Sequence, residues 1–240
     1  MNAINPLPWY VRTAAEQLAR RGMELRRHSA TRRQAMFAKH EVDLVLDVGA
    51  AAGAYGKQLR KFGYTGRMVS FESLSAAYES LRTTIAANQH WTAHNVALGD
   101  VPGRATINVA SNSDSSSLLP MLDAHRAAAP SIRFVSEETI TVARLDDVAE
   151  EAVRAALHPF LKVDTQGFER EVLAGGASTV QRCIGLQLEL SFVPLYDGGM
   201  LVDEAIGWAY AEGFHLVGIE QGYAAPSGEI LQVDGVFIRS

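Results

Sequence analysis

A short glycine-containing segment directly after an apolar run is the first place where this chain could bind a ligand. The run Leu44–Leu46 leads into Asp47, and Gly49 and Gly53 follow within a stretch of small residues. This order is typical of a buried parallel strand that turns sharply into a helix, with glycines where a ligand approaches the backbone closely. A tight junction without a ligand is the alternative interpretation of the same pattern.

A second acid, Glu72, ends the next apolar stretch, Arg67–Phe71. A carboxylate at the end of the strand beside such a turn can accept hydrogen bonds from both hydroxyls of a ribose. The turn and this acid together predict a site for an adenosine-containing ligand. We expect Ser73 and Leu74 to border the adenine and Ala97 to close its other face.

The spacing of the glycines selects among such ligands. Dinucleotide-binding folds have Gly-x-Gly-x-x-Gly, with a helix N-terminus facing a pyrophosphate, whereas this turn is Gly-x-x-x-Gly preceded by Asp47. An acid there repels a pyrophosphate and suits the cationic ammonium and sulfonium of S-adenosylmethionine. We therefore expect the methionine end of that donor over Gly49, Ala50 and Gly53, near Asp47 and Tyr55. An NAD-dependent oxidoreductase and a nucleotide-binding module without catalysis are the alternatives from other functional classes.

Length and composition are those of one α/β domain with a short extension. The chain has 240 residues, 48% of them hydrophobic, and its single cysteine, Cys183, cannot form an internal disulfide. No apolar run approaches the roughly 20 residues that span a bilayer, and we expect no signal peptide. These features predict a cytoplasmic protein without a transmembrane segment.

The formal net charge of −5 is unevenly distributed along the chain. Residues 1–40 contain eight Lys or Arg against two Glu, so the rest is strongly acidic. We do not expect nucleic acid as a partner, because the basic segment lacks interleaved aromatic residues and the acidic remainder repels phosphate. Residues 1–41 should form an N-terminal helical cap with solvated arginines, or serve a homodimer contact. Its helices are expected up to about His28 and over Thr31–His40.

Residues 42–240 alternate apolar strands with helices, which predicts an α/β domain with a mostly parallel sheet covered on both faces. Strands are expected at Val42–Val48, Arg67–Glu72, Trp91–Leu98, Phe160–Asp164, Ile184–Leu190, Phe214–Gln221 and Leu231–Arg239. Helices are expected between them, near Ala54–Phe62, Ser75–Asn88, Phe168–Ala174 and Val202–Glu212. The last two strands should pair antiparallel, because only a turn separates them.

Residues 99–147 depart from this alternation. Arg104–Ala110 and Glu138–Val142 alternate like strands, and they bracket the polar stretch Ser111–Ser117. Ligands of open α/β folds bind at the carboxyl ends of the strands, so an insertion at this point could cover the site as a lid. A flexible serine-rich loop is the alternative.

Two further acids end later strands and are candidates for a catalytic step. Asp164 ends the fourth expected strand of the main sheet and Glu189 the fifth. Transfer of the donor's methyl group needs the acceptor atom held about 3 Å from the methyl carbon and a group that removes the acceptor's proton. We expect Asp164 to contact the donor, and Asp164 or Glu189 to accept the proton or to help hold Mg²⁺, which prefers oxygen ligands. The alternatives are His94, His125 or His158 as the base, or carboxylates that only accept structural hydrogen bonds.

Several ordered motifs resemble the FkbM-type S-adenosylmethionine-dependent methyltransferases, from about Val42 to Arg239. They are Leu46–Gly53, Asn95–Asp100, Ser115–Leu118, Thr141–Asp147, Leu161–Glu169, Val172–Gly176, Leu188–Leu190 and Leu195–Gly198. Within Leu161–Glu169, Gln166 stands where the family more often has Glu. The resemblance implies a Rossmann-like class I methyltransferase fold with seven strands, the last antiparallel, and O-methylation of a hydroxyl on a sugar or a natural product.

The acceptor is expected beside the two acids, at Ser116, Gln166 and Tyr196. The Tyr196 ring could stack on a sugar, and a packed core position is its alternative. A lid rich in Ser and Asn favours a sugar or glycan hydroxyl, as in saccharide or glycolipid biosynthesis. The apolar side chains within residues 118–122 instead suit a polyketide or another small hydroxylated natural product.

Overall fold

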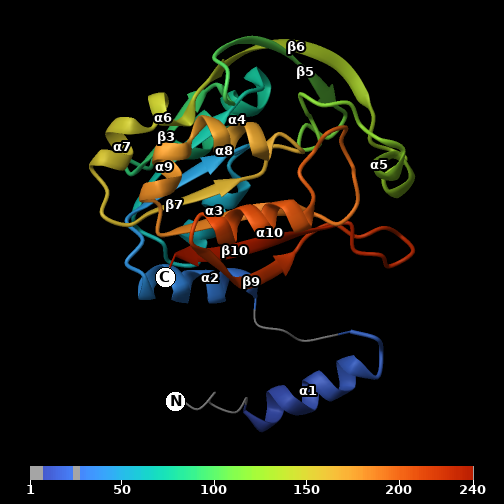
Figure 1. The fold of residues 1–240 in the computed structure, drawn as a ribbon. Coiled ribbons are helices and arrows are strands. Elements are labelled where there is room, and N and C mark those ends of the chain that lie inside the picture. The colour runs from blue at the N-terminus through green and yellow to red at the C-terminus, as the bar shows by residue number, and fades with distance from the viewer. Residues whose placement is uncertain (1–7, 24–27, 240) are drawn as a thin grey trace.

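The computed structural model describes residues 8–23 and 28–239 and centres on a seven-stranded sheet. Its strands are β1 (Leu44–Val48), β2 (Arg67–Glu72), β3 (Trp91–Asn95), β7 (Pro159–Val163), β8 (Gly185–Ser191), β9 (Phe214–Gln221) and β10 (Gln232–Arg239). The strand order is β3-β2-β1-β7-β8-β10-β9 (Figure 1). All neighbours pair in parallel except β10, which runs antiparallel to both β8 and β9. The predicted fold class, a mostly parallel sheet with an antiparallel last strand, is confirmed.

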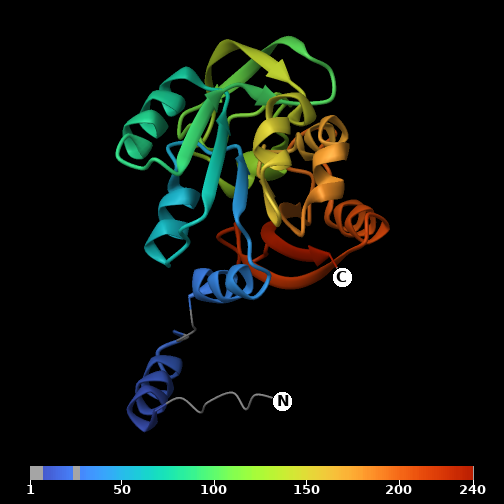
Figure 2. The ribbon, with the colours of Figure 1, turned by 90° about the vertical axis from the view of Figure 1, so that its left-hand side faces the viewer.

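Helices cover both faces of this sheet (Figure 2). One face packs against α2 (Ser29–Lys39), α3 (Ala54–Lys61) and α4 (Ser75–Ile85). The other packs against α6 (Leu145–Val148), α7 (Glu150–Arg154), α8 (Glu169–Gly175), α9 (Ala177–Arg182) and α10 (Val202–Ala211). Alternate residues of β1 point to opposite faces, so Val45 packs in the first core and Leu46 in the second. Both faces of β1 are buried, which explains its continuous apolar run.

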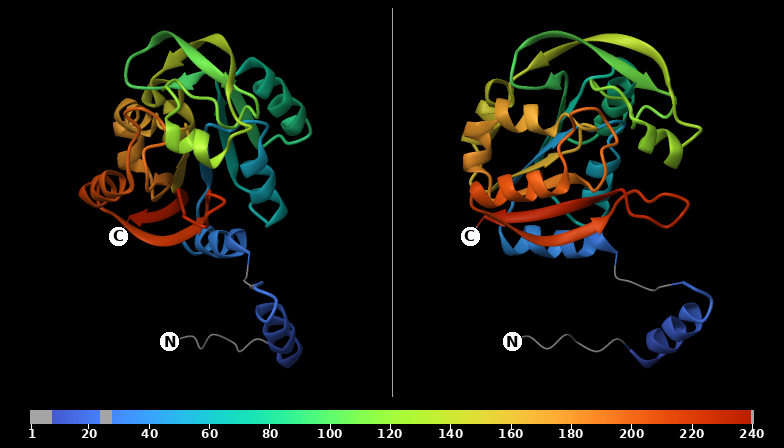
Figure 3. Two further views of the ribbon diagram at one scale, coloured as in Figure 1. Left: turned by 90° about the vertical axis from the view of Figure 1, so that its right-hand side faces the viewer. Right: turned by 45° about the vertical axis from the view of Figure 1, so that its right-hand side comes forward.

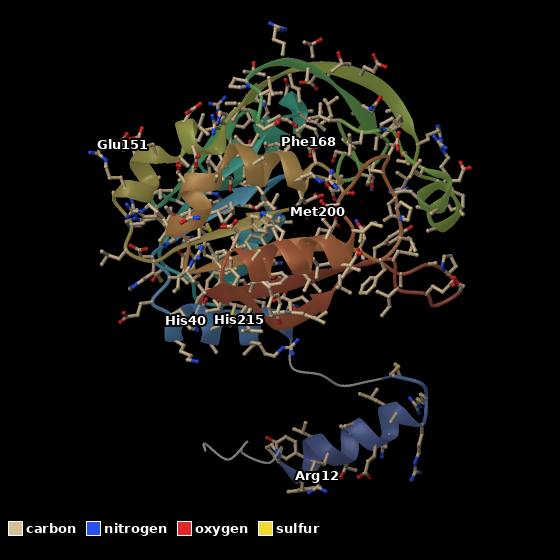
Figure 4. The ribbon with its side chains drawn as sticks, viewed as in Figure 1. Arg12, His40, Glu151, Phe168, Met200 and His215 are labelled. Atoms are coloured by element: carbon tan, nitrogen blue, oxygen red, sulfur yellow. The ribbon has the colours of Figure 1, made fainter. Side chains whose placement is uncertain are left out.

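The basic N-terminal segment contains two separate helices. The first, α1 (Trp9–Ala19), has no buried residue and lies outside the sheet and its covering helices (Figure 1). It ends well before His28, and residues 24–27 of the expected helix lie outside the described residues. Figure 4 labels Arg12 on this helix and His40 at the end of α2.

Helix α2 belongs to the domain itself. The Phe37 ring lies 4.7 Å from the Phe160 ring, and Arg33 is only 2% exposed. The Arg33 guanidinium donates to the side chains of Glu220 on β9 and Gln58 on α3. The expectation of solvated arginines is therefore wrong for Arg33, because its charge is neutralised by a buried acid.

The insertion, together with residues 97–98 just before it, forms a second, three-stranded sheet and a short helix. Its strands are β4 (Ala97–Leu98), β5 (Gly103–Ala110) and β6 (Phe134–Ala143), in the order β4-β6-β5, and its helix is α5 (Asp123–Ala128). The β5–β6 ribbon arches over the main sheet (Figure 3). The single strand expected over Trp91–Leu98 is divided between the two sheets. The division follows Asn95, whose side-chain amide donates to the Glu72 and Ser73 carbonyls.

The structure bears on two features noted in the sequence, the lack of a membrane-spanning segment and the single cysteine. None of the helices in the described part of the chain is long and apolar enough to cross a membrane. Cys183, the single cysteine of the chain, is buried and unpaired.

Helix α3 approaches β3 through a glycine. A Cβ atom at Gly56 would lie 2.2 Å from Cζ2 of the buried Trp91 ring. The Trp91 indole N–H donates to the Ser70 Oγ at 2.9 Å, and Ser70 donates to the Asp47 carboxylate at 3.3 Å. Close packing at Gly56 therefore also holds a hydrogen-bonded chain that leads to the end of β1.

We expect Gly56→Ala to lower the free energy of unfolding by about 1–3 kcal/mol, because the added methyl group overpacks against a fixed indole. Thermal unfolding measures this as a melting temperature several degrees lower. The matched control is Gly207→Ala in α10, where an added Cβ meets nothing within 4 Å. Helix propensity should make that control neutral or slightly stabilising. Equal melting temperatures for the two variants would contradict the packing argument.

Candidate active site

A cavity of about 290 Å³ lies at the carboxyl ends of β1, β2 and β7. One end is largely apolar and is lined by Leu74, Ala77, Ile107 and Leu118. The other is polar and is lined by Tyr55, Lys162, Asp164, Gln187 and Asp234. Phe168, labelled in Figure 4 just before α8, also lines it. The cavity therefore offers an apolar slot and a charged region to one ligand.

The turn after β1 forms the floor of the cavity. Gly49 has φ +73°, and a Cβ there would lie 1.8 Å from the Asp164 carbonyl oxygen. Only glycine allows β1 and β7 to end this close together. Gly53 also has positive φ, but its Cβ position faces Leu81 and Trp91 and not the cavity. The expectation of ligand approach at Gly53 is therefore wrong, because this glycine serves packing against α4 and β3.

Glu72 is fixed at the end of β2 by two backbone groups. Its carboxylate accepts hydrogen bonds from the Ala51 and Leu74 N–H groups, both at 2.8 Å. Burial raises the pKa of Glu72 above its ordinary value, although these two N–H groups oppose the shift. Ser73, Leu74 and Ala97 line the cavity together with Glu72. The four residues expected around an adenosine thus all line this cavity.

Asp47 lies beneath the cavity and does not line it. The side chain is 1% exposed, and the Lys162 Nζ lies 3.2 Å from its Oδ1. The two residues are neighbours in the register of β1 and β7, which explains the pairing. The expected contact between Asp47 and a donor ammonium is therefore wrong. Lys162 already neutralises this charge, and Lys162, not Asp47, reaches the cavity.

Lys162 joins the ends of the two central strands. Its ammonium donates to the Gly49 carbonyl at 3.0 Å and lies 3.5 Å from the Asp164 Oδ2. Burial by itself lowers the pKa of Lys162, but the Asp47 and Asp164 carboxylates outweigh it and raise the pKa above its ordinary value. The group is therefore a permanent cation between two acids.

The polar row continues through Gln187 on β8. Gln187 Oε1 accepts from the Tyr55 hydroxyl at 3.0 Å and from Arg33 at 3.4 Å. Gln187, Lys162 and Asp234 are three polar lining residues on strands that the sequence interpretation did not assign to the site. The sequence pattern that could have identified them is a polar side chain inside an otherwise apolar strand. The same pattern also fits a solvent-exposed position at the edge of a sheet.

A second group of acids lies directly after β7, at Asp164, and within the last part of β8, at Glu189. Gln166 Nε2 donates to the Asp164 Oδ1 at 2.9 Å and to the Glu189 Oε2 at 3.1 Å. Burial raises the pKa of Glu189 well above its ordinary value, and the nearby carboxylates of Asp164 and Glu169 add to the shift. Asp164 lines the cavity, whereas Glu189 reaches it only through Gln166.

These residues do not fit the expected Mg²⁺ site. Among the described residues there is no group of three or more His, Cys, Asp or Glu side chains that could hold a metal ion. The space between Asp164 and Glu189 is taken by an amide that donates to both of them. Since Mg²⁺ needs several oxygen ligands in near-octahedral geometry, the prediction of Mg²⁺ is not supported.

The three residues expected at the acceptor lie in different surroundings. Ser116 and Gln166 line the cavity. Tyr196 is 2% exposed, and its hydroxyl lies 2.9 Å from the Gln166 Oε1 and 3.0 Å from the Ser115 carbonyl. The alternative of a packed core position therefore holds for Tyr196. Stacking of its ring on an acceptor is wrong, because no ring face is accessible.

The three histidines considered as bases lie outside the lining of the cavity. His94 stacks on Phe71 at 5.5 Å, and the His158 ring lies 3.2 Å from the Glu41 carbonyl. His125 is buried, and burial lowers its pKa. The acids at the strand ends, and not these histidines, are therefore the candidate proton acceptors.

The pKa of Asp234 gives a test of the charge at this end of the cavity. Burial and the neighbouring Asp164 carboxylate raise the pKa of Asp234 to about 6. The folded state therefore binds more protons than the unfolded state, and the contribution of Asp234 to stability falls as pH rises through the interval between about 4 and about 6. We expect Asp234→Asn to leave stability unchanged near pH 4 and to raise it by about 1–3 kcal/mol near pH 7.5.

Urea unfolding at both pH values measures this difference. The control is Asp100→Asn, which changes an exposed acid in the same way and should show no pH-dependent gain. A gain for Asp234→Asn that is equal at the two pH values would contradict the raised pKa.

One known protein family matches most of the chain. The family described as "Methyltransferase FkbM domain" matches residues 47–216. A search of curated proteins gives no significant match.

Three solved structures illustrate the structural likeness. Fibrillarin of Aeropyrum pernix with natively bound S-adenosyl-L-methionine has a TM-score of 0.46 at 10% identity, over 82% of this chain and 66% of that one. Magnesium protoporphyrin IX methyltransferase of Synechocystis with bound S-adenosylmethionine has 0.48 at 10% identity, over 88% and 77%. A putative RNA methyltransferase of Pyrococcus horikoshii has 0.45 at 10% identity, over 88% and 84%.

None of these three structures identifies a substrate for this chain, because the sequences have diverged too far. The family match is of a different kind, since it spans more than two thirds of the sequence and includes the turn after β1, Asp164 and Glu189. The chain therefore belongs to the FkbM methyltransferase domain family.

Proposed function

We propose that this protein transfers the methyl group of S-adenosylmethionine to a hydroxyl group of a sugar or glycan. The observation that carries the proposal is the single cavity that joins Glu72 to Asp164 across the Gly49 turn. Membership of the family supplies methyl transfer as the type of reaction. The donor, the oxygen atom as acceptor and the sugar are our inferences from the residues that line the cavity.

The two ends of the cavity suit the two ends of the donor. Its apolar slot beside Leu74, Ile107 and Leu118 suits an adenine ring, and Glu72 suits the ribose hydroxyls. At the polar end, we assign the methionine ammonium to Asp164 and Asp234, since Lys162 neutralises Asp47. S-adenosylmethionine supplies an electrophilic methyl group on a sulfonium.

Asp164 is our candidate for the group that removes the acceptor proton. It lines the cavity, and its side chain is 33% exposed, whereas Glu189 lies behind it. A positioned base contributes about 10²–10⁴ to the rate. Holding the two substrates in line contributes more, roughly 7–11 kcal/mol in favourable cases. The fixed floor of the cavity therefore matters as much as the base.

The insertion supplies the polar side of the acceptor region. Ser113, Asp114 and Ser116 line the cavity, and Leu118 is the apolar residue beside them. Met121, which could have lined a site for a hydrophobic acceptor, is buried in a separate small core. This composition favours a sugar or glycan over a polyketide or another hydrophobic natural product. A cytoplasmic location and a homodimer remain predictions from the sequence.

Donor binding is the first test. We expect S-adenosylhomocysteine to bind the wild-type protein in calorimetry, and Glu72→Ala to weaken binding by about 1.5–3 kcal/mol through loss of charge-assisted hydrogen bonds. Glu79→Ala, an exposed acid on α4, is the matched control and should bind as the wild type does. NAD should not bind. Preference for NAD, or full affinity in Glu72→Ala, would contradict the donor assignment.

Acceptor chemistry is the second test. With labelled S-adenosylmethionine, we expect label in a panel of free and lipid-linked sugars and none in polyketide aglycones. Asp164→Asn should lower turnover by about 10²-fold or more, because the base is removed. Asp100→Asn is the matched control. Label in the aglycones alone would contradict the sugar, and undiminished turnover in Asp164→Asn would contradict the base.

A further inference from the structure

We propose that Gln166 is a positioning residue whose side-chain amide occupies the place between Asp164 and Glu189 that a divalent cation would otherwise take. The inference rests on the proposed methyl transfer, because it concerns how the acid that removes the acceptor proton is held. It goes beyond that function in assigning the site a cation-free arrangement and naming the residue responsible.

The Gln166 side chain uses both of its polar ends. Nε2 donates to Asp164 Oδ1 at 2.9 Å and lies 3.3 Å and 3.1 Å from the two Glu189 oxygens. Oε1 accepts from the Tyr196 hydroxyl at 2.9 Å. The carboxylates and the hydroxyl therefore fix which way the amide faces, because only the nitrogen can donate to acids.

The backbone of Gln166 is fixed as firmly as its side chain. Its φ of +55° is rare for a residue with a side chain, and its carbonyl accepts from the Ser117 Oγ at 2.7 Å. A Cβ at the next residue, Gly167, would lie 2.9 Å from the Tyr196 Cβ. The loop after β7, the serine loop of the insertion and Tyr196 thus converge on this one residue.

An amide side chain at position 166 affects cation binding differently from a carboxylate. A cation between Asp164 and Glu189 would meet the N–H groups of Gln166, which carry partial positive charge, and only two acidic side chains. A carboxylate in place of the amide would add a third acid and remove the N–H groups. That arrangement repels itself unless a cation binds among the three. In this chain, the amide instead holds the two acids together without a metal.

This arrangement leaves Asp164 without a bound metal ion, so that its carboxylate can act as the proton acceptor. In the transfer, the acceptor oxygen bonds to the methyl carbon while the carbon–sulfur bond breaks and its electron pair stays on sulfur. The hydroxyl proton passes to Asp164. Gln166 touches Asp164 and not the reacting atoms, so it positions the base and takes no proton itself.

Titration with MgCl₂ alone tests the proposal. We expect calorimetry to detect no saturable Mg²⁺ binding to the wild-type protein. Gln166→Glu should gain saturable Mg²⁺ binding, at least about tenfold tighter than the weakest binding that the wild-type titration could have detected, because three carboxylates then share one space. Its melting temperature should be below that of the wild type without Mg²⁺ and should rise when Mg²⁺ is added. The matched control is Gln181→Glu, the same change on the exposed face of α9, which should gain neither effect.

Saturable Mg²⁺ binding to the wild-type protein that Glu189→Gln abolishes would overturn the proposal. Absence of any Mg²⁺ effect on folded Gln166→Glu would overturn it too. If Gln166→Glu does not fold, the wild-type and Glu189→Gln titrations still decide, because neither protein carries the Gln166→Glu change. Binding of S-adenosylhomocysteine to the same wild-type sample reports separately on the proposed function. Its failure would contradict the donor, and not the amide between the two acids.

Discussion

A buried ammonium group, that of Lys162, is the constraint on which the ligand-binding edge of the sheet depends. It lies between the Asp47 and Asp164 carboxylates and donates to the carbonyl of Gly49. Removing one member of such a group leaves an uncompensated buried charge, which costs about 3–5 kcal/mol. The end of β1, the end of β7 and the glycine turn are therefore held as one unit, and the floor of the cavity is rigid before any ligand arrives.

Polar contacts extend from this centre in both directions across the sheet. Toward β3, Asp47 is bonded to Ser70, which is bonded in turn to the Trp91 indole. Toward the other edge, the Lys162 ammonium lies over the Tyr55 ring, 5.5 Å from its centroid. The Tyr55 hydroxyl donates to the Gln187 side chain, which also accepts from Arg33. Helix α2 thus contacts the floor of the site, although the charge pattern of the sequence suggested an extension that only caps the domain. Above this floor, Gln166 connects the acids of the site to the insertion.

The order of strands and helices could be predicted because the central strands β1, β2 and β7 are largely apolar and the long helices that alternate with the strands have a polar face. The elements that the sequence did not predict correctly are too short to show a period, or their residue pattern fits more than one structure. Helices α5, α6, α7 and α9 have four to six residues each, too few for a helical period to show. The division of Trp91–Leu98 between two sheets depends on the Asn95 side chain, which bonds to a distant part of the backbone. No local sequence pattern predicts such a contact.

The sequence alone determined the parallel sheet, the glycine turn, the acids at the ends of the strands and the family of the chain. These properties follow from the order of residue types along the chain, which local periodicity expresses directly. Only the tertiary structure decided which of the acids face a ligand. Asp47 and Glu72 both lie in the last two residues of an apolar strand, yet Lys162 neutralises Asp47 below the cavity while Glu72 lines it. The physical reason is that the free energy of a buried charge depends on the partners that folding brings near it, and those partners are distant in the sequence.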